Sequence, residues 1–220
     1  EITDAETFAR DWTVIDVNSD VSANTWAYND GNAMYTQDKS NAADDWLIAP
    51  AVTLEAGKAY KVSAYVKHSS TFGSDKQKIE LKIGTAPTVE GLTTRLVYDE
   101  SFQSRLFVEK SGTFSPAESG VFYVGLRCYS ESYNGDLYFQ KIVIEEAPVY
   151  PAQITDLSIV AGERGAMSAT LSWTWPSSDH LGGALSNLLG AKIYRGTDLV
   201  ATLDTATVGG KAGWIDSSIE

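Results

Sequence analysis

The sequence predicts an all-β protein, a jelly-roll β-sandwich followed by a second, incomplete sandwich. Apolar and polar residues alternate with a period of two, as in residues 59–68 and 78–84. This alternation predicts antiparallel strands with one face buried and the other in water. Turn-forming segments separate the strands at short intervals, at residues 72–77, 84–91, 115–120 and 132–136. Many short strands at this spacing are typical of sandwiches and jelly rolls.

The elements follow in chain order. Residues 2–10 and 88–94 are compatible with short helical turns. In the first part of the chain we expect strands over residues 59–68, 78–84, 95–102, 105–114, 121–130 and 136–146. Pro148 and Pro151 then mark an extended linker, since proline and the residue before it favour extended backbone. Residues 154–162, 166–176, 191–203 and 212–219 continue as a second β pattern. The predicted domains are residues 1–148 and 149–220.

Cysteine and histidine are scarce, which limits the chemistry that the chain can perform. Cys128 is the only cysteine, so the chain forms no internal disulfide. It shares its parity with Phe122, Val124 and Leu126, which predicts a small buried apolar residue rather than a reactive thiol. His68 and His180 are the only histidines, too few for a thiolate or imidazole zinc site. The sequence therefore predicts that the protein is not an enzyme.

The formal net charge is −12, from 29 acidic and 17 basic residues. This balance argues against nucleic acid and anionic membranes, because both attract clusters of Lys and Arg. No stretch approaches the roughly 18 apolar residues of a membrane span. The first residues lack a basic start followed by an apolar core, so they contain no signal peptide. We expect a secreted or cell-surface protein whose signal peptide has been removed.

Several motifs of the first segment resemble those of a known family. They are FARDW with Phe8 and Trp12, an acidic loop ending at Trp26, ADDWLIAPAVTLEAGKAYKVSAYV, LKIGTAPTVEGLTT and the last two predicted strands. In this order they resemble the choice-of-anchor J family, which is related to the cleaved adhesin domains of Bacteroidetes surface proteases such as gingipains. The resemblance implies a jelly-roll fold and a noncatalytic module of a secreted or surface protein.

The second segment resembles the start of a fibronectin type III domain. The expected strands run over residues 154–160 and 169–175, with Trp173 in the core. Tyr194 and Arg195 resemble the family's "YRdG" pattern, and residues 214–216 its "ytD" pattern. The family normally has two more strands. We therefore expect a partial, immunoglobulin-like domain that packs on the first domain or is completed by another chain.

Acidic residues concentrate near the N-terminus and suggest a calcium site. Residues 1–45 contain ten acids and two bases, and Asp16, Asn18 and Asp20 place oxygen ligands at every second position. The glycine and the final Glu of an EF-hand loop are missing, so this is not an EF-hand. Asp44 or Asp45 is a further candidate ligand, although extended backbone directs neighbouring side chains to opposite faces. The alternative is a turn with solvated charges.

The family resemblance also bears on calcium. Related adhesin domains carry structural calcium, which the resemblance implies here without identifying its ligands. Gln140 and Lys141 occupy positions that are often acidic in the family's closing strand. If acidic residues at these two positions bind metal in other family members, this chain lacks that contribution.

Three aromatic residues in loops or at strand ends are candidates for ligand binding. They are Phe72, Tyr129 and Tyr133. Exposed aromatic rings stack on the apolar faces of sugars, although a scatter of exposed tyrosines is also normal. Trp12, Trp26 and Trp46 are predicted to be core residues instead.

The sequence thus predicts a noncatalytic adhesion or carbohydrate-binding module, with a glycan or a host or matrix protein as partner. Calcium is its candidate cofactor, and further domains of the same polypeptide are expected. One alternative is a structural spacer whose loops bind nothing. Another is an accessory part of a larger surface protease or glycan-degrading enzyme. Asp44 and Asp45 are adjacent in sequence, but adjacency does not establish the distance between two catalytic carboxyl groups that a glycosidase needs.

Overall fold

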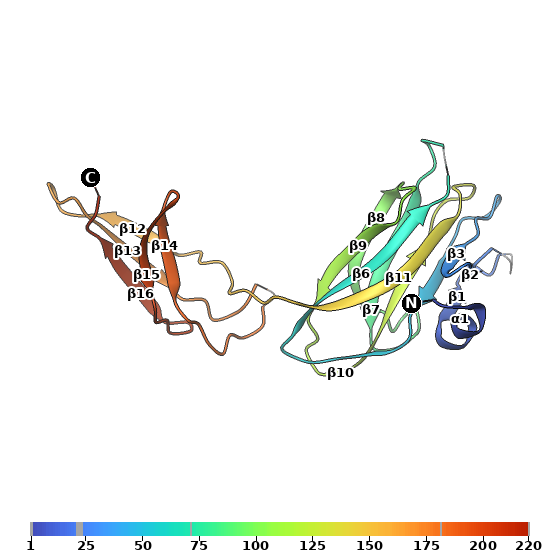
Figure 1. The fold of residues 1–220 in the computed structure, drawn as a ribbon, viewed down its shortest axis with the longest axis horizontal. Coiled ribbons are helices and arrows are strands. Elements are labelled where there is room, and N and C mark those ends of the chain that lie inside the picture. The colour runs from blue at the N-terminus through green and yellow to red at the C-terminus, as the bar shows by residue number, and fades with distance from the viewer. Residues whose placement is uncertain (1, 21–23, 71, 181, 220) are drawn as a thin grey trace. The chain divides into compact units, whose positions relative to one another are not determined.

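The computed structural model describes residues 2–20, 24–70, 72–180 and 182–219. The chain divides into two units, Glu1–Ala147 (unit 1) and Pro148–Glu220 (unit 2). Both are built from antiparallel strands, and the described residues contain one short α-helix (Figure 1). The predicted all-β class is therefore confirmed.

Unit 1 is a two-sheet sandwich. Its elements are α1 (Ala5–Asp11), β1 (Thr13–Asp16), β2 (Trp26–Asn29), β3 (Asn32–Tyr35), β4 (Asp45–Ile48), β5 (Val52–Leu54), β6 (Ala59–His68), β7 (Gln77–Gly84), β8 (Thr94–Phe102), β9 (Val108–Phe114), β10 (Gly120–Cys128) and β11 (Leu137–Ala147). One sheet has the order β1-β4-β10-β7-β8, with β5 also paired to β10. The other has the order β2-β3-β11-β6-β9.

The helix forms where the sequence permits a capped turn. Asp4 is its N-cap, and its carboxylate accepts a hydrogen bond from the backbone N–H of Thr7 at 2.7 Å. Phe8 and Trp12 face the core, where the Trp12 ring lies edge-on to Phe139 with centroids 5.3 Å apart. Residues 88–94 contain one short helical turn, in which the backbone N–H of Leu92 donates to the carbonyl of Thr88 at 3.2 Å, and β8 begins at Thr94.

The core of unit 1 lies between the two sheets. Phe122, Val124, Leu126 and Cys128 are all at most 7% exposed on β10, as their shared parity predicts. They pack in one apolar cluster with residues of the opposite sheet, including Phe139. Burial raises the pKa of the Cys128 thiol to about 12, so the cysteine is an inert core residue.

Four loops connect one sheet to the other at the same end of the sandwich. They are the β3–β4 loop (residues 36–44), the β6–β7 loop (69–76), the β8–β9 loop (103–107) and the β10–β11 loop (129–136). Each begins on a strand of one sheet and ends on a strand of the other, which is the connectivity of a jelly roll. Residues far apart in sequence therefore meet at this end (Figure 1).

Unit 2 contains two smaller sheets. A three-stranded sheet has the order β12 (Ser158–Ala161), β13 (Ala169–Thr174) and β16 (Lys211–Asp216), and a hairpin pairs β14 (Ala191–Arg195) with β15 (Asp198–Leu203). The strand expected from residue 154 begins only at Ser158, because the Asp156 carboxylate accepts hydrogen bonds from Thr174. The strand expected over residues 191–203 turns at Gly196, whose φ is +64°. The fibronectin type III resemblance stays a prediction.

Candidate functional site

A cavity of about 310 Å³ opens among three of the loops that join the sheets. The β3–β4, β6–β7 and β10–β11 loops contribute its walls. The described residues that line it are Gln37, Lys39, Ser69, Ser70, Phe72, Asp75, Tyr133 and Gly135. Aromatic, cationic, anionic and hydroxyl groups thus converge on one concave surface.

Two of the three aromatic candidates from the sequence lie in this cavity. Phe72 is 69% exposed and Tyr133 is 65% exposed, so both rings are largely in water. They come from different loops and are brought together by the crossing of the chain between the sheets. Large rings that stay exposed beside a cavity are available to stack on a ligand.

The loops around the cavity are tied to one another. The backbone N–H of Gly135 donates to Gln37 Oε1 at 2.7 Å, and that of Gln37 donates to Asp136 Oδ1 at 3.0 Å. The backbone N–H of Asp136 donates to Ser69 Oγ at 2.7 Å, and that of Ser69 donates back to the Asp136 carbonyl at 2.9 Å. These bonds join all three loops, so the cavity is largely formed before any ligand arrives.

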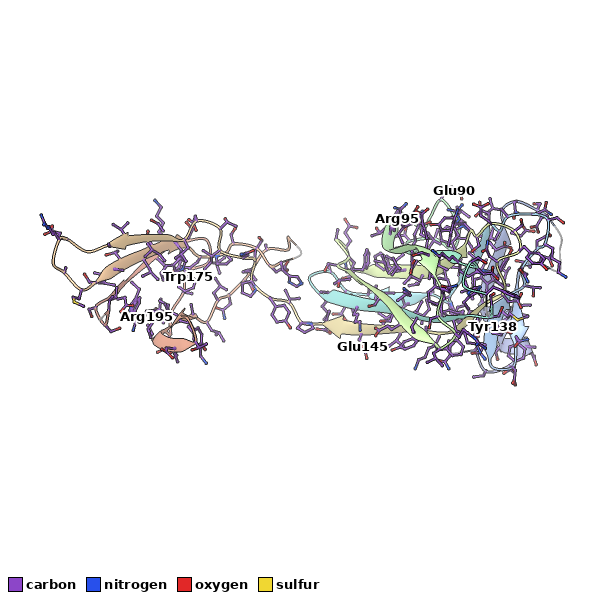
Figure 2. All side chains as sticks on the ribbon, turned by 90° about the horizontal axis from the view of Figure 1, so that it is seen from above. Glu90, Arg95, Tyr138, Glu145, Trp175 and Arg195 are labelled. Atoms are coloured by element: carbon purple, nitrogen blue, oxygen red, sulfur yellow. The ribbon has the colours of Figure 1, made fainter. Side chains whose placement is uncertain are left out.

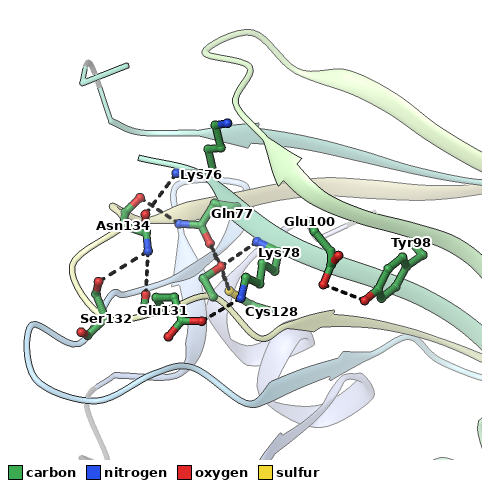
Figure 3. A network of polar contacts seen from close by, with 10 residues as sticks. Lys76, Gln77, Lys78, Tyr98, Glu100, Cys128, Glu131, Ser132 and Asn134 are labelled. Atoms are coloured by element: carbon green, nitrogen blue, oxygen red, sulfur yellow. Dashed lines mark hydrogen bonds and ion pairs between the residues drawn. The ribbon is translucent and has the colours of Figure 1, made fainter. Parts of the chain in front are cut away.

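A buried glutamine holds the β10–β11 loop that carries Tyr133. Gln77 is fully buried, and its Nε2 donates to the carbonyls of Asn134 at 3.1 Å and Gly135 at 2.5 Å. Its Oε1 accepts from the hydroxyl of Ser130 at 2.5 Å. Figure 3 shows this network between the start of β7 and the loop, with Asn134 Oδ1 also accepting from the backbone N–H of Lys76. The loop conformation is therefore specified from the interior of the sandwich.

Tyr133 itself adopts a backbone conformation that side chains rarely occupy. Its φ is +64°, and its backbone N–H donates to the carbonyl of Asp38 at 2.9 Å. Such left-handed residues cost about 1 kcal/mol or more and persist where the surroundings fix them. The Asp38 carboxylate in turn accepts from the backbone N–H groups of Ser40 and Asn41 and from Asn24 Nδ2, which lowers its pKa to about 2.

Gly135 is required where the β6–β7 and β10–β11 loops approach each other. Its φ is +81°, and a Cβ there would lie 2.9 Å from His68 Nε2 and 3.0 Å from the Cβ of Ser70. Both the backbone angle and the close approach therefore exclude a side chain. Gln103 supports the β6–β7 loop from the other side, where its Nε2 donates to the carbonyls of Phe72 and Asp75.

The third aromatic candidate, Tyr129, lies outside this cavity. Its ring stacks on Tyr98 with centroids 6.1 Å apart, and the Arg127 guanidinium lies 5.0 Å from its centroid. Its hydroxyl is buried without a hydrogen-bond partner among the described residues, and burial raises its pKa. The structure thus brings Phe72 and Tyr133 together and places Tyr129 directly after β10, against Tyr98 of β8.

The acidic residues near the N-terminus form a hydrogen-bonded turn. Asp16 Oδ1 accepts from the backbone N–H of Ser19 at 2.7 Å. Asn18 Nδ2 donates to Asp20 Oδ2 at 3.1 Å and to the carbonyl of Ala42 at 2.7 Å. Among the described residues, His, Cys, Asp and Glu form no group of three or more placed to hold a metal ion. Residues 21–23, which follow this turn, lie outside the described residues.

Asp44 and Asp45 have different environments. Asp44 forms a two-pronged ion pair with Arg127, with contacts of 2.7 and 2.8 Å, so both its oxygens are already occupied. Asp45 is fully buried, and its Oδ1 has no hydrogen-bond partner among the described residues. Burial raises the pKa of Asp45 to about 7, with a smaller contribution from the charges of Asp16 and Asp20. A charged carboxylate oxygen without a partner is unfavourable in an apolar interior. A hard cation beside it would compensate its charge.

Several groups that shape the cavity escape the analysis of sequence patterns. Gln77 and Asp38 are buried polar residues, and their roles depend on carbonyls and N–H groups that are remote in sequence or set by loop conformation. Lys39 and Gln37 belong to a loop with no distinctive pattern. The one available signal was Asn134-Gly135, a turn dipeptide beside two tyrosines.

Comparison with known proteins gives similarities in solved structures alone. No family model matches the chain, and no curated protein matches it. The K1 cleaved adhesin domain of Lys-gingipain from Porphyromonas gingivalis W83 is 13% identical, with 62% of this chain and 91% of that chain covered and a TM-score of 0.47. A family 4 carbohydrate-binding module is 15% identical (66% and 93% covered, TM-score 0.45). The module TmCBM61, in complex with β-1,4-galactotriose, is 16% identical (64% and 90% covered, TM-score 0.42). What the cavity binds is therefore inferred from the side chains that line it.

Proposed function

We propose that unit 1 is a noncatalytic carbohydrate-binding module of a secreted or cell-surface protein. The observation that carries the proposal is the pair of exposed rings, Phe72 and Tyr133, beside a preformed cavity with polar walls. Sugars present apolar C–H faces and hydroxyl rims. Aromatic rings bind the faces, while Ser, Gln, Lys and Asp side chains bind the hydroxyls.

The cavity favours a glycan over the alternative of a spacer without a ligand. A spacer gains nothing from two large aromatic rings, Phe72 and Tyr133, that stay mostly in water beside a cavity. One or a few sugar units match its volume of about 310 Å³.

Binding of neutral oligosaccharides by the full 220-residue chain tests this function. Cellohexaose, xylohexaose and galactotriose are titrated by calorimetry against the parent chain and against Phe72→Ala and Tyr133→Ala. We expect each variant to weaken binding of the preferred sugar about tenfold or more, because the apolar contact with the ring is lost. Tyr194→Ala removes a 55% exposed tyrosine in unit 2 and serves as the matched control.

Two results would contradict the carbohydrate proposal. One is the absence of binding to every oligosaccharide on a broad glycan array. The other is binding that both cavity variants leave unchanged while circular dichroism shows them folded.

We also propose a structural calcium ion beside the buried oxygen of Asp45. The orphaned Oδ1 of Asp45 favours this position, and Asp16 is the cross-strand partner of Asp45. Asn18 Oδ1 and backbone carbonyls would supply the uncharged ligands. Asp44 is better suited to holding Arg127 than to binding metal, since its oxygens are engaged.

Thermal melting in calcium and in chelator tests the ion. Because the unfolded chain does not gather these oxygens, millimolar calcium should raise the melting temperature and EDTA should lower it. Asp45→Asn should remove the response, whereas Asp30→Asn, in the turn between β2 and β3, should keep it. Equal melting temperatures in calcium and EDTA would contradict the calcium proposal. The acidic residues would then be a solvated turn, and Asp45 would be protonated.

A further inference from the structure

A second cavity, of about 240 Å³, adjoins the first at the same end of unit 1. The described residues that line it are Lys67, His68, Ser69, Arg105 and Tyr138. Ser69 lines both cavities, so the two are neighbours. Of the described residues that line the second cavity, two are cationic and none is acidic.

The two cations of this cavity have no carboxylate partner. Among the described residues, neither Lys67 nor Arg105 forms an ion pair or a side-chain hydrogen bond, and neither does Lys39 in the first cavity. The chain has a large excess of acids, and other cations of unit 1 do pair with them: Lys58, Lys61, Lys78, Lys82, Arg95, Lys110 and Arg127. Unpaired cations in such a chain are available to an anion from outside.

Lys67 is held in place without losing its charge. Its Nζ lies 4.5 Å from the centroid of the Tyr138 ring and 4.8 Å from that of Phe107. Tyr138, labelled in Figure 2, stands on β11 as the cross-strand partner of Lys67, and Phe107 ends the β8–β9 loop just before β9. Cation–π contacts position an ammonium group but leave its positive charge uncompensated. Lys67 is thus preorganised to meet an anion.

Ser69 and His68 complete the wall of this cavity. Ser69 Oγ accepts from the backbone N–H of Asp136, so its hydroxyl proton remains free to donate. His68 is buried, and its Nε2 donates to the carbonyl of Asn134 in the tautomer that this carbonyl requires. His68 therefore fixes the β10–β11 loop, while Lys67, Arg105 and Ser69 offer donors to a ligand.

Three carboxylates of the loops around the two cavities accept hydrogen bonds from neutral donors. Asp136 accepts from the backbone of Gln37, and Asp75 from the hydroxyl of Ser70. Asp38 accepts from backbone and amide N–H groups and is 5% exposed. None of the hydrogen bonds described for these three carboxylates involves Lys67 or Arg105.

We propose that the second cavity binds the carboxylate or sulfate group of an acidic sugar whose neighbouring unit stacks on Phe72 and Tyr133. The inference rests on the proposed carbohydrate function and specifies its ligand as an anionic oligosaccharide. Arg105 and Lys67 supply the charge-assisted hydrogen bonds, and Ser69, shared by both cavities, lies where the two sugar units meet.

Calorimetry with three hexasaccharides on the full chain tests the proposal. Hexagalacturonate is the carboxylate probe, a κ-carrageenan hexasaccharide the sulfate probe and cellohexaose the neutral one. We expect at least one acidic probe to bind about tenfold or more tightly than the neutral probe, with an affinity that falls as salt rises. Lys67→Gln and Arg105→Gln should abolish this preference and leave binding of the neutral probe unchanged.

Control variants separate the cavity from the net charge of the chain. Lys211→Gln removes one lysine of unit 2 and should not alter the preference, while Lys67→Arg should retain most of it. The ratio of the two acidic affinities identifies carboxylate or sulfate as the preferred group.

The possible results separate the anionic site from the carbohydrate function. Neutral binding without any acidic preference, or a preference that Lys67→Gln and Arg105→Gln leave intact, would overturn the anionic site alone. Absence of binding to all three probes and to a broad glycan array would overturn both proposals. Acidic binding that survives Phe72→Ala but is lost in Lys67→Gln would support the anionic site and overturn the stacking role of Phe72.

Discussion

Units 1 and 2 show the same sequence alternation but very different burial. In unit 1 the inward residues of two facing sheets form one continuous core, and Ile79, Ile83 and Phe139 are fully buried. In unit 2 the buried apolar residues among those described are Trp173 and Trp175. The side chains in Figure 2 are correspondingly dense in unit 1 and sparse in unit 2.

Unit 2 also exposes many large apolar side chains. They include Leu157, Ile159, Val160, Met167, Leu189, Tyr194, Leu199 and Ile215. A three-stranded sheet and a hairpin offer too few strands to cover both of their inner faces. The comparison teaches that alternation predicts a strand, whereas a core requires a second sheet of matching width.

The largest expected difference between the units is the cost of removing an apolar side chain. Phe139→Ala leaves a cavity in the core of unit 1 and should destabilise it by about 3–5 kcal/mol. Ile215→Ala removes a 61% exposed side chain from unit 2 and should change stability by less than about 0.5 kcal/mol. Urea unfolding of both variants measures this contrast, and equal effects would contradict it.

A smaller effect is expected where unit 1 holds its binding loops. Gln77→Ala leaves the carbonyls of Asn134 and Gly135 and the hydroxyl of Ser130 without their partner, at a cost of about 1–3 kcal/mol. It should also weaken sugar binding by loosening Tyr133. Gln103→Ala, at an exposed glutamine that holds the other loop, should cost about 0.5 kcal/mol or less.

Hydrogen exchange distinguishes these two glutamine variants. Faster exchange confined to residues 129–136 is expected in Gln77→Ala, and to residues 69–76 in Gln103→Ala. Unchanged exchange in the first segment would show that the loop does not depend on Gln77.

A further effect is expected only in acid, as a pH dependence at Asp38. Its pKa falls from 3.8 to about 2 because backbone and amide N–H groups donate to the ionised carboxylate. A folded pKa below the unfolded one stabilises the protein above about pH 4, and this contribution is lost as the pH falls towards 2. Asp38→Asn should therefore be less stable than the parent at pH 7, with a difference that shrinks in acid.

Melting curves of both proteins between pH 7 and pH 2 measure this effect. Asp30→Asn, in the exposed turn between β2 and β3, controls for the loss of one negative charge. A gap between parent and Asp38→Asn that stays constant across this range would contradict the assigned role of the carboxylate.

Long strands with one wet face could be predicted from the sequence almost residue by residue. The range 59–68 coincides with β6, and 78–84 lies within β7. Strands β1 to β5 have three or four residues each, too few to show a period. β4 is buried on both faces and so does not alternate at all.

The sequence predicted that aromatic residues line the candidate site, but it identified only some of the residues that do. Phe72 and Tyr133 follow from aromatic residues in turn-forming segments, and the structure places them together. Tyr129 carries the same sequence signal but directly follows β10, where it stacks on Tyr98. Lys67 and Arg105 gave no signal, because their isolation from carboxylates depends on which loops meet.

The crossing of the loops between sheets has a mechanical consequence. The hydrogen bonds among Gln37, Ser69, Gly135 and Asp136 join segments that each bridge the two layers of unit 1. A force that slides one layer over the other must break these hydrogen bonds at the same time, so the bonds resist shear between the layers. A glycan bound as proposed would therefore load the sandwich at the end where these hydrogen bonds join its two layers.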